Sequence, residues 1–410
     1  MHRVYIGIDW SENKHDAAFV NSAGAHIASL TFKHTPEGFR QFDATRTKLG
    51  LPLDASLVGI ETAHNLLIDF LWSRAYSEVY VIPPSVVKSS RGRDGPSGAH
   101  TDYTDAVLIA NMLRTDLPRF HPWHPGSVLT RQIRAQVSLI NYLTRKSVSA
   151  VNRLRAVLIR YYPAALEPFG HLRSQISLKF VQAFPSPQTA QSLTLDELKA
   201  FAAAHGYTQP RRLPSYLAAL HAPHPQAAPE TVLIYQDEAV FLAEHSLSLR
   251  VAKVNALRKL TKLFQQHPDA PIFDSLPGAA QFLAPALLAF FGEDRQRFPT
   301  KRSIQCLAGT CPVTVQSGKH RVVKFRRACD HDFRTVTQQW AKSSLAESTW
   351  ANAYWQRVRP HCDSDSHAYR CLANRWLAIL WKMWQTHEPY DEARHLQQLA
   401  KYATPRQDFV

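Results

Sequence analysis

The first 125 residues open with three short strand patterns in quick succession, and this order limits the possible folds more than any other feature. The three predicted strands are residues 4–9, 16–21 and 26–32. Helical patterns follow over residues 35–49, 63–75 and 101–114. Strand patterns lie between them, over residues 56–61 and 78–84. Three meandering strands followed by alternating helices and strands predict a mixed α/β sheet, with a flexible Gly-rich loop over 90–100.

The charge of the chain predicts a polyanionic partner. Among the 410 residues, 48 are Lys or Arg and 33 are Asp or Glu, which gives a net charge of +15. Such a charge favours nucleic acid or an anionic membrane surface. Asp9, Glu12 and Lys14 interrupt any signal-peptide core, and we find no apolar run of about 18 residues. We therefore expect nucleic acid rather than a membrane as the partner, in the cytoplasm, where five cysteines also fit a reducing compartment.

Four carboxylates stand out in the N-terminal part. Asp9 ends the first predicted strand, Glu61 ends the fourth, and Asp102 and Asp105 share one face of the helix that follows. Each has an ordinary explanation alone, such as an ion pair or, for Asp102, a helix N-cap. In a sheet of the ribonuclease H type, the first and fourth strands are neighbours, so the four acids would converge. They would repel each other unless Mg²⁺ or Mn²⁺ neutralised them, which predicts metal-dependent phosphoryl transfer.

Residues 127–166 predict one long basic helix. The segment has no Gly, no acid, and no Pro before Pro163, and it carries seven cations. Its main heptad position holds Ile133, Ile140, Leu154 and Tyr161. We expect a coiled-coil helix with a basic exterior facing phosphates, although an ordinary core helix explains the apolar seam as well. The candidate phosphate contacts are Arg145, Lys146, Arg153 and Arg155.

The rest of the chain is predicted to be mostly helical. Residues 167–235 are Pro-rich and suggest a small helical insertion, and a long helix resumes over 236–266. The turn at Leu276, Pro277 and Gly278 resembles half of a helix–hairpin–helix, or is a simple turn. Six of nine tryptophans lie in the last 75 or so residues and indicate an aromatic core. The expected domains are 1–125, 126–270 and 271–410.

Residues 308–327 form the densest polar segment of the chain. A turn at Gln316, Ser317 and Gly318 precedes the basic residues Lys319, Arg321, Lys324, Arg326 and Arg327, which are further candidates for binding nucleic acid. Taken alone, this is an ordinary polar turn.

Four stretches of the chain together resemble a known family: YIGIDWSENKHD, GIETAHN, TDYTDA and LAGTCPVTVQSGK. They look like the DEDD-type insertion-sequence transposases, which are recombinases guided by a bridge RNA. The resemblance implies a RuvC-like domain, a coiled-coil linker and a C-terminal transposase domain. It implies that Asp9, Glu61, Asp102 and Asp105 bind metal and that Ser317 is the nucleophile that forms a phosphoserine link to DNA.

The same resemblance implies the partners, which are the DNA of the element ends and target, a guide RNA, and further copies of the chain in a dimer or tetramer. In the family the acids and the serine come from different protomers. Two alternatives stay open: a RuvC-like metal-dependent junction nuclease that lacks a serine nucleophile, and a nucleic-acid-binding protein without catalysis. His361, Cys362, His367 and Cys371 are ligand types for zinc, but their spacing matches no standard zinc finger, so we expect no zinc there. The pair of cysteines in CLAGTC (306–311) is a weaker candidate.

Overall fold

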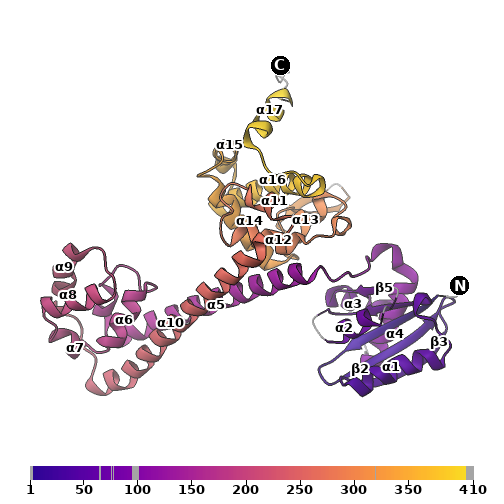
Figure 1. Cartoon of the computed structure of the whole chain (residues 1–410), viewed down its shortest axis with the longest axis horizontal. Coiled ribbons are helices and arrows are strands. Elements are labelled where there is room, and N and C mark those ends of the chain that lie inside the picture. Colours follow the sequence, from indigo (N-terminus) through magenta and orange to yellow (C-terminus); the bar gives the residue numbers. More distant parts are fainter. Residues whose placement is uncertain are drawn as a thin grey trace. The chain divides into compact units, whose positions relative to one another are not determined.

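The computed structural model describes residues 3–63, 66–74, 76, 78–94, 101–318 and 320–402. The chain divides into two compact units, residues 1–125 and 126–410, and each is described here by itself. Figure 1 labels the helices and strands of both units.

The first unit is built on a five-stranded sheet. Its strands are β1 (Val4–Trp10), β2 (Lys14–Asn21), β3 (His26–Lys33), β4 (Ser56–Ile60) and β5 (Glu78–Val81), in the order β3-β2-β1-β4-β5. The first three strands pair antiparallel, whereas β1 with β4 and β4 with β5 pair parallel. The prediction of a mixed sheet with β1 beside β4 is therefore confirmed.

Helices cover both faces of this sheet. They are α1 (Pro36–Lys48), α2 (Leu66–Ser73), α3 (Pro84–Ser90) and α4 (Asp102–Asp116). Val4, Ile6 and Ile8 of β1 pack into the core under α1 and α2, whereas Tyr5, one residue out of phase, packs with α3 and α4. Side chains alternate between the faces of a strand, so the odd-numbered residues of β1 face α4.

Local signals fix most of these element ends, and two expectations need correction. Thr35 caps α1 through the backbone N–H of Gly38, as predicted. The prolines stop the fifth strand, as predicted, but it ends at Val81 and not at residue 84, and Pro84 begins α3, because proline is favourable in the first turn of a helix. The predicted loop over 90–100 begins with a short 3₁₀ helix, Arg91–Asp94, and residues 95–100 lie outside the described residues.

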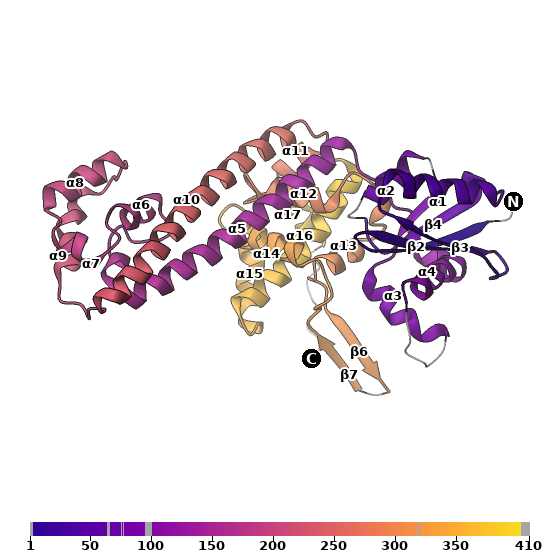
Figure 2. The ribbon, with the colours of Figure 1, turned by 90° about the horizontal axis from the view of Figure 1, so that it is seen from below.

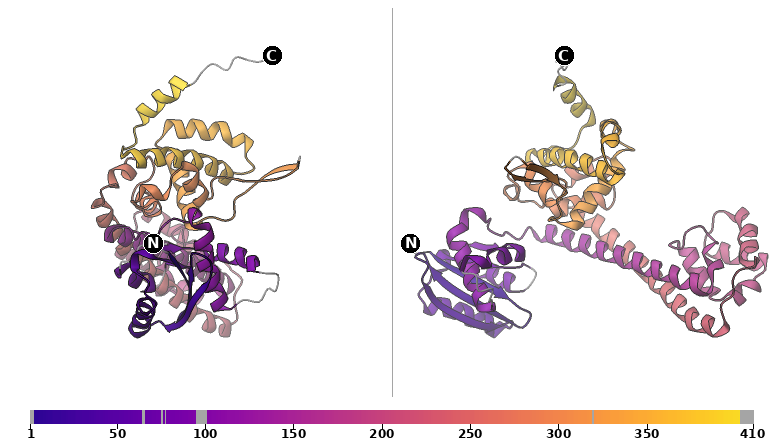
Figure 3. Two further views of the ribbon diagram at one scale, coloured as in Figure 1. Left: turned by 90° about the vertical axis from the view of Figure 1, so that its right-hand side faces the viewer. Right: turned by 180° about the vertical axis from the view of Figure 1, so that it is seen from behind.

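Two long helices form the axis of the second unit. Helices α5 (Val128–Tyr161) and α10 (Pro229–Gln265) lie side by side (Figures 1 and 3). The start of α5 shares a core with the end of α10, and the end of α5 shares another with the start of α10, so the two helices are antiparallel. The predicted heptad residues are buried: Ile133, Ile140, Leu154 and Tyr161. The long helix is confirmed, and its interpretation as a coiled coil stays a prediction.

Each end of this helix pair carries its own core. At one end are the helices of the Pro-rich segment, α6 (Gln175–Ala183), α7 (Pro187–Gln191), α8 (Leu195–Ala204) and α9 (Leu213–His221). At the other end are α11 (Ala270–Asp274), α12 (Leu283–Phe291), α13 (Lys301–Leu307), α14 (His331–Ser344), α15 (Thr349–Val358) and α16 (Asp365–Thr386), followed by α17 (Glu392–Tyr402). Trp340, Trp376 and Trp384 are fully buried there, which confirms the aromatic core.

The turn between α11 and α12 allows two helices to pack closely. Gly278 has a φ of +69°, and a Cβ atom there would lie 2.5 Å from the backbone carbon of Ser343 in α14. Its N–H donates to Glu347 Oε2 at 2.7 Å, so this donor is already used within the protein. A close helix contact already accounts for the glycine, which favours the simple turn over half of a helix–hairpin–helix.

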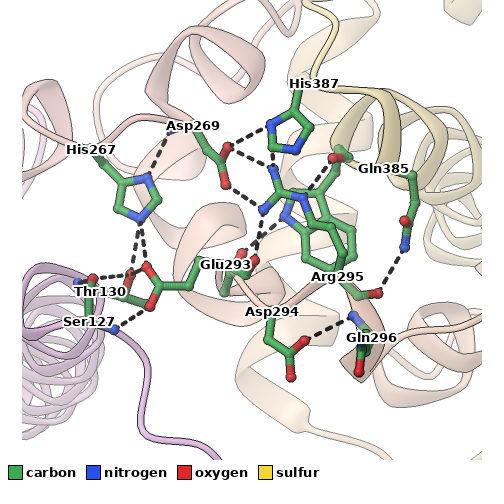
Figure 4. Close-up of polar contacts among 12 residues, drawn as sticks. Ser127, Thr130, His267, Asp269, Glu293, Asp294, Arg295, Gln296, Gln385 and His387 are labelled. Carbon is green, nitrogen blue, oxygen red and sulfur yellow. Dashed lines mark hydrogen bonds and ion pairs between the residues drawn. The ribbon is translucent and has the colours of Figure 1, made fainter.

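A buried polar network ties the beginning of α5 to this helical core (Figure 4). His267 Nδ1 accepts the N–H of Asp269, and its Nε2 lies 3.0 Å from Thr130 Oγ1, whose hydroxyl in turn contacts Glu293. Arg295 forms two hydrogen bonds of 2.7 Å to the carboxylate of Asp269. Burial lowers the pKa of His267, so its neutral form is the one that this network holds.

Candidate active site and nucleic-acid interface

Asp9 and Glu61 extend from neighbouring strands towards the same helix. Asp9 follows Tyr5 and Gly7 on the α4 face of β1. Glu61 comes directly after β4, which ends at Ile60 rather than at Glu61. Because β1 and β4 are parallel and in register from Val4 with Ser56 to Ile8 with Ile60, both acids lie at the carboxyl edge of the sheet.

Two glycines let α4 bring its acids to this edge. Gly7 and Gly59 are register partners on β1 and β4. A methyl group on Gly7 would collide with the carbonyl oxygen of Ala106, and one on Gly59 would lie 2.7 Å from Ile109 Cγ2. The backbone of α4 therefore sits directly on the sheet. This contact lies within one turn of Asp105, which is 8% exposed.

The two acids in the first turn of α4 differ in their exposure to solvent. Thr101, not Asp102, is the N-cap, because its hydroxyl accepts the N–H of Thr104 at 3.2 Å. Asp102 is the first residue of the helix and its side chain is half exposed. Asp105 points inwards, three residues later on the same face.

The acids are electrostatically coupled. Burial, followed by the charges of Glu61, Asp105, Asp102 and Asp16, raises the pKa of Asp9 to about 7. Burial and the charge of Asp105 also raise the pKa of Glu61, and Arg91 partly offsets this effect. The structure therefore brings the four predicted acids into one electrostatic group, in which Asp9 holds its charge at the greatest cost.

Three charged residues of this group were missed at the sequence level. Asp16 lies directly opposite Asp9 in the antiparallel pair of β1 and β2, and so shares its face of the sheet. Lys14 lies 3.3 Å from Asp102 and 3.5 Å from Asp16, and Arg91 holds Asp105 through hydrogen bonds of 3.0 and 2.7 Å. The second strand begins at Lys14 and not at the predicted Asp16. Its antiparallel register with β1 is the signal that pairs Asp16 with Asp9.

The chemistry of this group fits a hard divalent cation. Carboxylate oxygens are the ligands that Mg²⁺ and Mn²⁺ prefer, and a cation would relieve the repulsion that raises the pKa of Asp9. Among the described residues, however, no three of these carboxylates have oxygens within 4.8 Å of one another. Lys14 and Arg91 instead supply the positive charge beside Asp102 and Asp105.

Ser317 lies in the second unit, at the end of an exposed two-stranded ribbon. The ribbon consists of β6 (Val313–Ser317) and β7 (His320–Lys324), which project from the helices of that unit (Figure 2). His320 is the cross-strand partner of Ser317, whereas Arg321 pairs with Gln316 and faces the other side. Ser317 is exposed, so its hydroxyl can reach an external substrate.

The predicted basic residues of the ribbon have different surroundings. Arg321, Lys324 and Arg327 are exposed. Arg326 is half-buried and donates to the carbonyl oxygen of Cys311 at 3.0 Å, so it anchors the base of the ribbon. Lys319 lies outside the described residues.

The exterior of α5 is less purely basic than expected. Arg145 pairs with Asp332 of α14 at 2.7 Å, and Arg153 pairs with Glu238 of α10 at 2.6 Å. Lys146 and Arg155 are exposed, and Lys146 lies over the ring of Tyr142. Partners from other helices neutralise half of the predicted set, which a sequence pattern confined to α5 cannot show.

Comparison with known proteins places these features in a family. Residues 6–163 match a transposase family model of the DEDD type, and residues 270–356 match the model of the IS116/IS110/IS902 transposase family. The chain is 31% identical to the IS117 mini-circle transposase of Streptomyces coelicolor over 95% of its own length and 96% of that relative. The chain belongs to the IS110 family of insertion-sequence transposases.

Other similar proteins agree with this assignment. The transposase is 24% identical to an uncharacterized 42 kDa protein of the insertion element IS900 from Mycobacterium paratuberculosis, over 95% of this chain and 98% of that protein. It is 22% identical to an uncharacterized 43.6 kDa protein of the element IS110 from S. coelicolor, over 93% of each chain. As an insertion-sequence transposase it is an enzyme that acts on DNA. No helix in the described part of the transposase is long and apolar enough to cross a membrane.

Proposed function

We propose that the transposase is an RNA-guided recombinase in which Ser317 attacks DNA and Asp9, Glu61, Asp102 and Asp105 bind Mg²⁺ or Mn²⁺. The observation that carries the acid half is the pKa of Asp9, raised to about 7 by burial and by four neighbouring carboxylates. A buried acid with a structural role is normally paired with a cation, whereas Asp9 is surrounded by other carboxylates, and strongly perturbed acids cluster at functional sites.

The acids would act on a phosphate group through a bound metal ion. Bound there, a divalent cation would polarise phosphate oxygens and offset the charge that develops on them. Asp9 and Glu61, on adjacent strand ends, would supply its ligands together with Asp105 of α4. Lys14 and Arg91, which now pair with Asp102 and Asp105, are then free to contact the DNA backbone.

The serine supplies the covalent step. Ser317 Oγ loses its proton to a base and bonds to phosphorus, and the bond from phosphorus to one deoxyribose oxygen breaks, so that this oxygen leaves as a hydroxyl. The resulting phosphoserine ester keeps the energy of the phosphodiester for rejoining. His320, the cross-strand partner of Ser317, is our candidate for the base that accepts the proton.

A guide RNA and self-association complete the proposal. The net charge of +15 and the exposed cations of α5 and of the ribbon suit two nucleic acids bound at once. We infer that the active species is a dimer or tetramer. We also propose that the chain is divided into a RuvC-like domain (1–125), a linker (126–270) and a C-terminal transposase domain (271–410).

The serine role is tested by trapping the covalent product. Purified transposase is incubated with labelled element-end DNA, target DNA, the element-encoded RNA and Mg²⁺, and is then run on a denaturing gel. We expect a protein–DNA adduct, and mass spectrometry should locate it on Ser317. Ser317→Ala should abolish the adduct and recombination but keep DNA and RNA binding, because one hydroxyl adds little to an interface dominated by phosphate contacts.

Thr314→Ala is the matched control, since Thr314 is an exposed hydroxyl residue on the opposite face of the same strand. It should retain the adduct. Full activity of Ser317→Ala, with strand cleavage that still depends on the four acids, would favour the metal-dependent nuclease. Loss of metal-dependent cleavage in the acid variants would exclude a nucleic-acid-binding role without catalysis.

A further inference from the structure

A cluster of metal-binding side chains lies at the corner between α15 and α16, apart from the proposed catalytic residues. It consists of Cys362, His367 and Cys371, whose donor atoms all lie within 4.8 Å of one another. It is the only such group of three among the described residues. Spacing along the sequence had argued against it, but convergence in space is what a metal ion requires.

We propose that Cys362, His367 and Cys371 bind a zinc ion that fastens this corner of the second unit. In a tetrahedral site with bond lengths near 2.0–2.3 Å, ligand atoms lie roughly 3.5–3.8 Å apart. The three donor atoms need to move little to reach that separation. Two thiols and an imidazole are also the ligand types that select zinc over Mg²⁺ or Ca²⁺.

The backbone already holds these ligands in place. His367 and Cys371 are four residues apart in the first turns of α16, so they lie on one face of the helix. Cys362 follows the short 3₁₀ helix Arg359–His361 and reaches the same face from the loop. Arg359 donates to the carbonyl oxygen of Cys362 at 3.0 Å and pairs with Asp365 of α16, so it links the loop to the start of that helix.

Ser364 and Asp363 complete this arrangement. The hydroxyl of Ser364 caps α16 by accepting the N–H of His367 at 3.3 Å, which defines where the helix begins. The carboxylate of Asp363 lies 3.7 Å from His367 Nδ1. It can orient the imidazole or supply the fourth ligand, and a water molecule can fill that position otherwise.

Zinc binding at this cluster should depend on pH. When zinc binds, each thiol releases its proton to solvent and bonds as a thiolate, so binding should weaken as the pH falls.

Zinc binding at this corner would also affect the ribbon that carries Ser317. Arg370, next to Cys371 on α16, lies 4.6 Å from the ring of Phe325, the residue that follows β7. Arg334 of α14 lies over the same ring at 4.5 Å. A cation that fixes the first turns of α16 would therefore also hold the base of the ribbon.

The test is metal analysis of the full-length protein, purified under reducing conditions and dialysed against metal-free buffer. We expect about one zinc per chain, as for a structural site. Cys362→Ser, His367→Gln and Cys371→Ser should each lower the zinc content severalfold. Cys306→Ser, Cys311→Ser and His361→Gln are matched controls that should retain it, because none of these residues belongs to the group of converging donor atoms found among the described residues.

Cobalt spectroscopy keeps the proposal testable if a variant fails to fold. Wild-type protein refilled with Co²⁺ should show thiolate-to-cobalt charge-transfer and tetrahedral d–d absorption bands, and zinc should displace them. Absence of both zinc and cobalt binding in the wild type would overturn the proposal. So would a Cys362–Cys371 disulfide found by peptide mapping in protein prepared with reductant, or equal loss of zinc in the controls.

Discussion

The ionisation of Asp9, in the first unit, depends strongly on its surroundings. Its pKa in the folded protein is about 7, against an ordinary value of 3.8. Between these two values the folded state binds more protons than the unfolded state, so stability falls as the pH rises. The ionised form of Asp9 therefore destabilises the folded protein near neutral pH, and a bound cation would offset this destabilisation.

Asp9→Asn should stabilise the protein at high pH and not at low pH. At pH 8 we expect a gain of about 1–2 kcal/mol, allowing for the partial exposure of the side chain, and at pH 4 almost none. Thermal unfolding at both pH values measures this, with the exposed Asp54→Asn as control. Mg²⁺ should raise the melting temperature of the wild type more than that of Asp9→Asn. Equal gains at pH 4 and pH 8 would contradict this account.

Asp269 and Arg295 form an ion pair in the second unit, in which the carboxylate is buried. Asp269 Oδ1 and Oδ2 each accept a hydrogen bond of 2.7 Å from the guanidinium, and the carboxylate is 6% exposed. Asp269→Ala leaves that guanidinium unpaired and should cost about 3–5 kcal/mol. Asp294→Ala removes only the cap of a short 3₁₀ helix and should cost about 1 kcal/mol. Chemical denaturation compares the two variants, and similar losses would refute the role given to the ion pair.

At the scale of elements, the position of α4 decides where the acids meet. The helix packs on Gly7 and Gly59 because neither strand presents a side chain there. Any side chain on Gly7 has to push α4 away from the sheet, and Asp105 moves with it.

Gly7→Val should destabilise the first unit by about 2–3 kcal/mol or more, as overpacking does in well-packed cores. Gly92→Ala is the control, because nothing lies within 4 Å of a Cβ atom there, and it should change stability by less than about 0.5 kcal/mol. Denaturant unfolding provides the measurement. A wild-type stability for Gly7→Val would mean that α4 can shift without cost.

The cations of α5 allow an element-scale test of nucleic-acid binding. Each phosphate contact contributes about 0.9 to the slope of log affinity against log salt. Lys146→Gln with Arg155→Gln should flatten that slope by up to about 2, because both side chains are exposed. Arg145→Gln with Arg153→Gln should change it less, since Asp332 and Glu238 already neutralise these arginines. Filter binding at several salt concentrations measures both slopes, and an unchanged slope in both double variants would show that α5 contacts protein only.

For the whole molecule, the two compact units have separate hydrophobic cores. Calorimetry should therefore resolve two unfolding transitions. Gly7→Val should lower the melting temperature of one transition and Asp269→Ala that of the other. A single transition that both substitutions shift equally would show that the units unfold together.

The sequence by itself determined the pattern of the first unit and the identity of its acids. Strand alternation decides which face a residue takes, so Asp9 and Glu61 could be assigned to one sheet edge before any coordinates. The amphipathic seam of α5 and the N-cap at Thr35 are local in the same sense. The family followed from four short motifs, because they combine residue types that a core alone does not require.

Only the tertiary structure decided what depends on partners distant in the chain. Asp16 and Lys14 join the acids through hairpin register, and Arg91 does so from a segment that had been predicted as a loop. Arg145 and Arg153 form ion pairs with acids of other helices. Gly278, in the α11–α12 turn, allows close contact with α14. Cys362, His367 and Cys371 converge although their spacing fits no familiar motif. A sequence pattern reports the neighbours along a strand or helix, whereas charge pairing and metal binding depend on distances that folding alone sets.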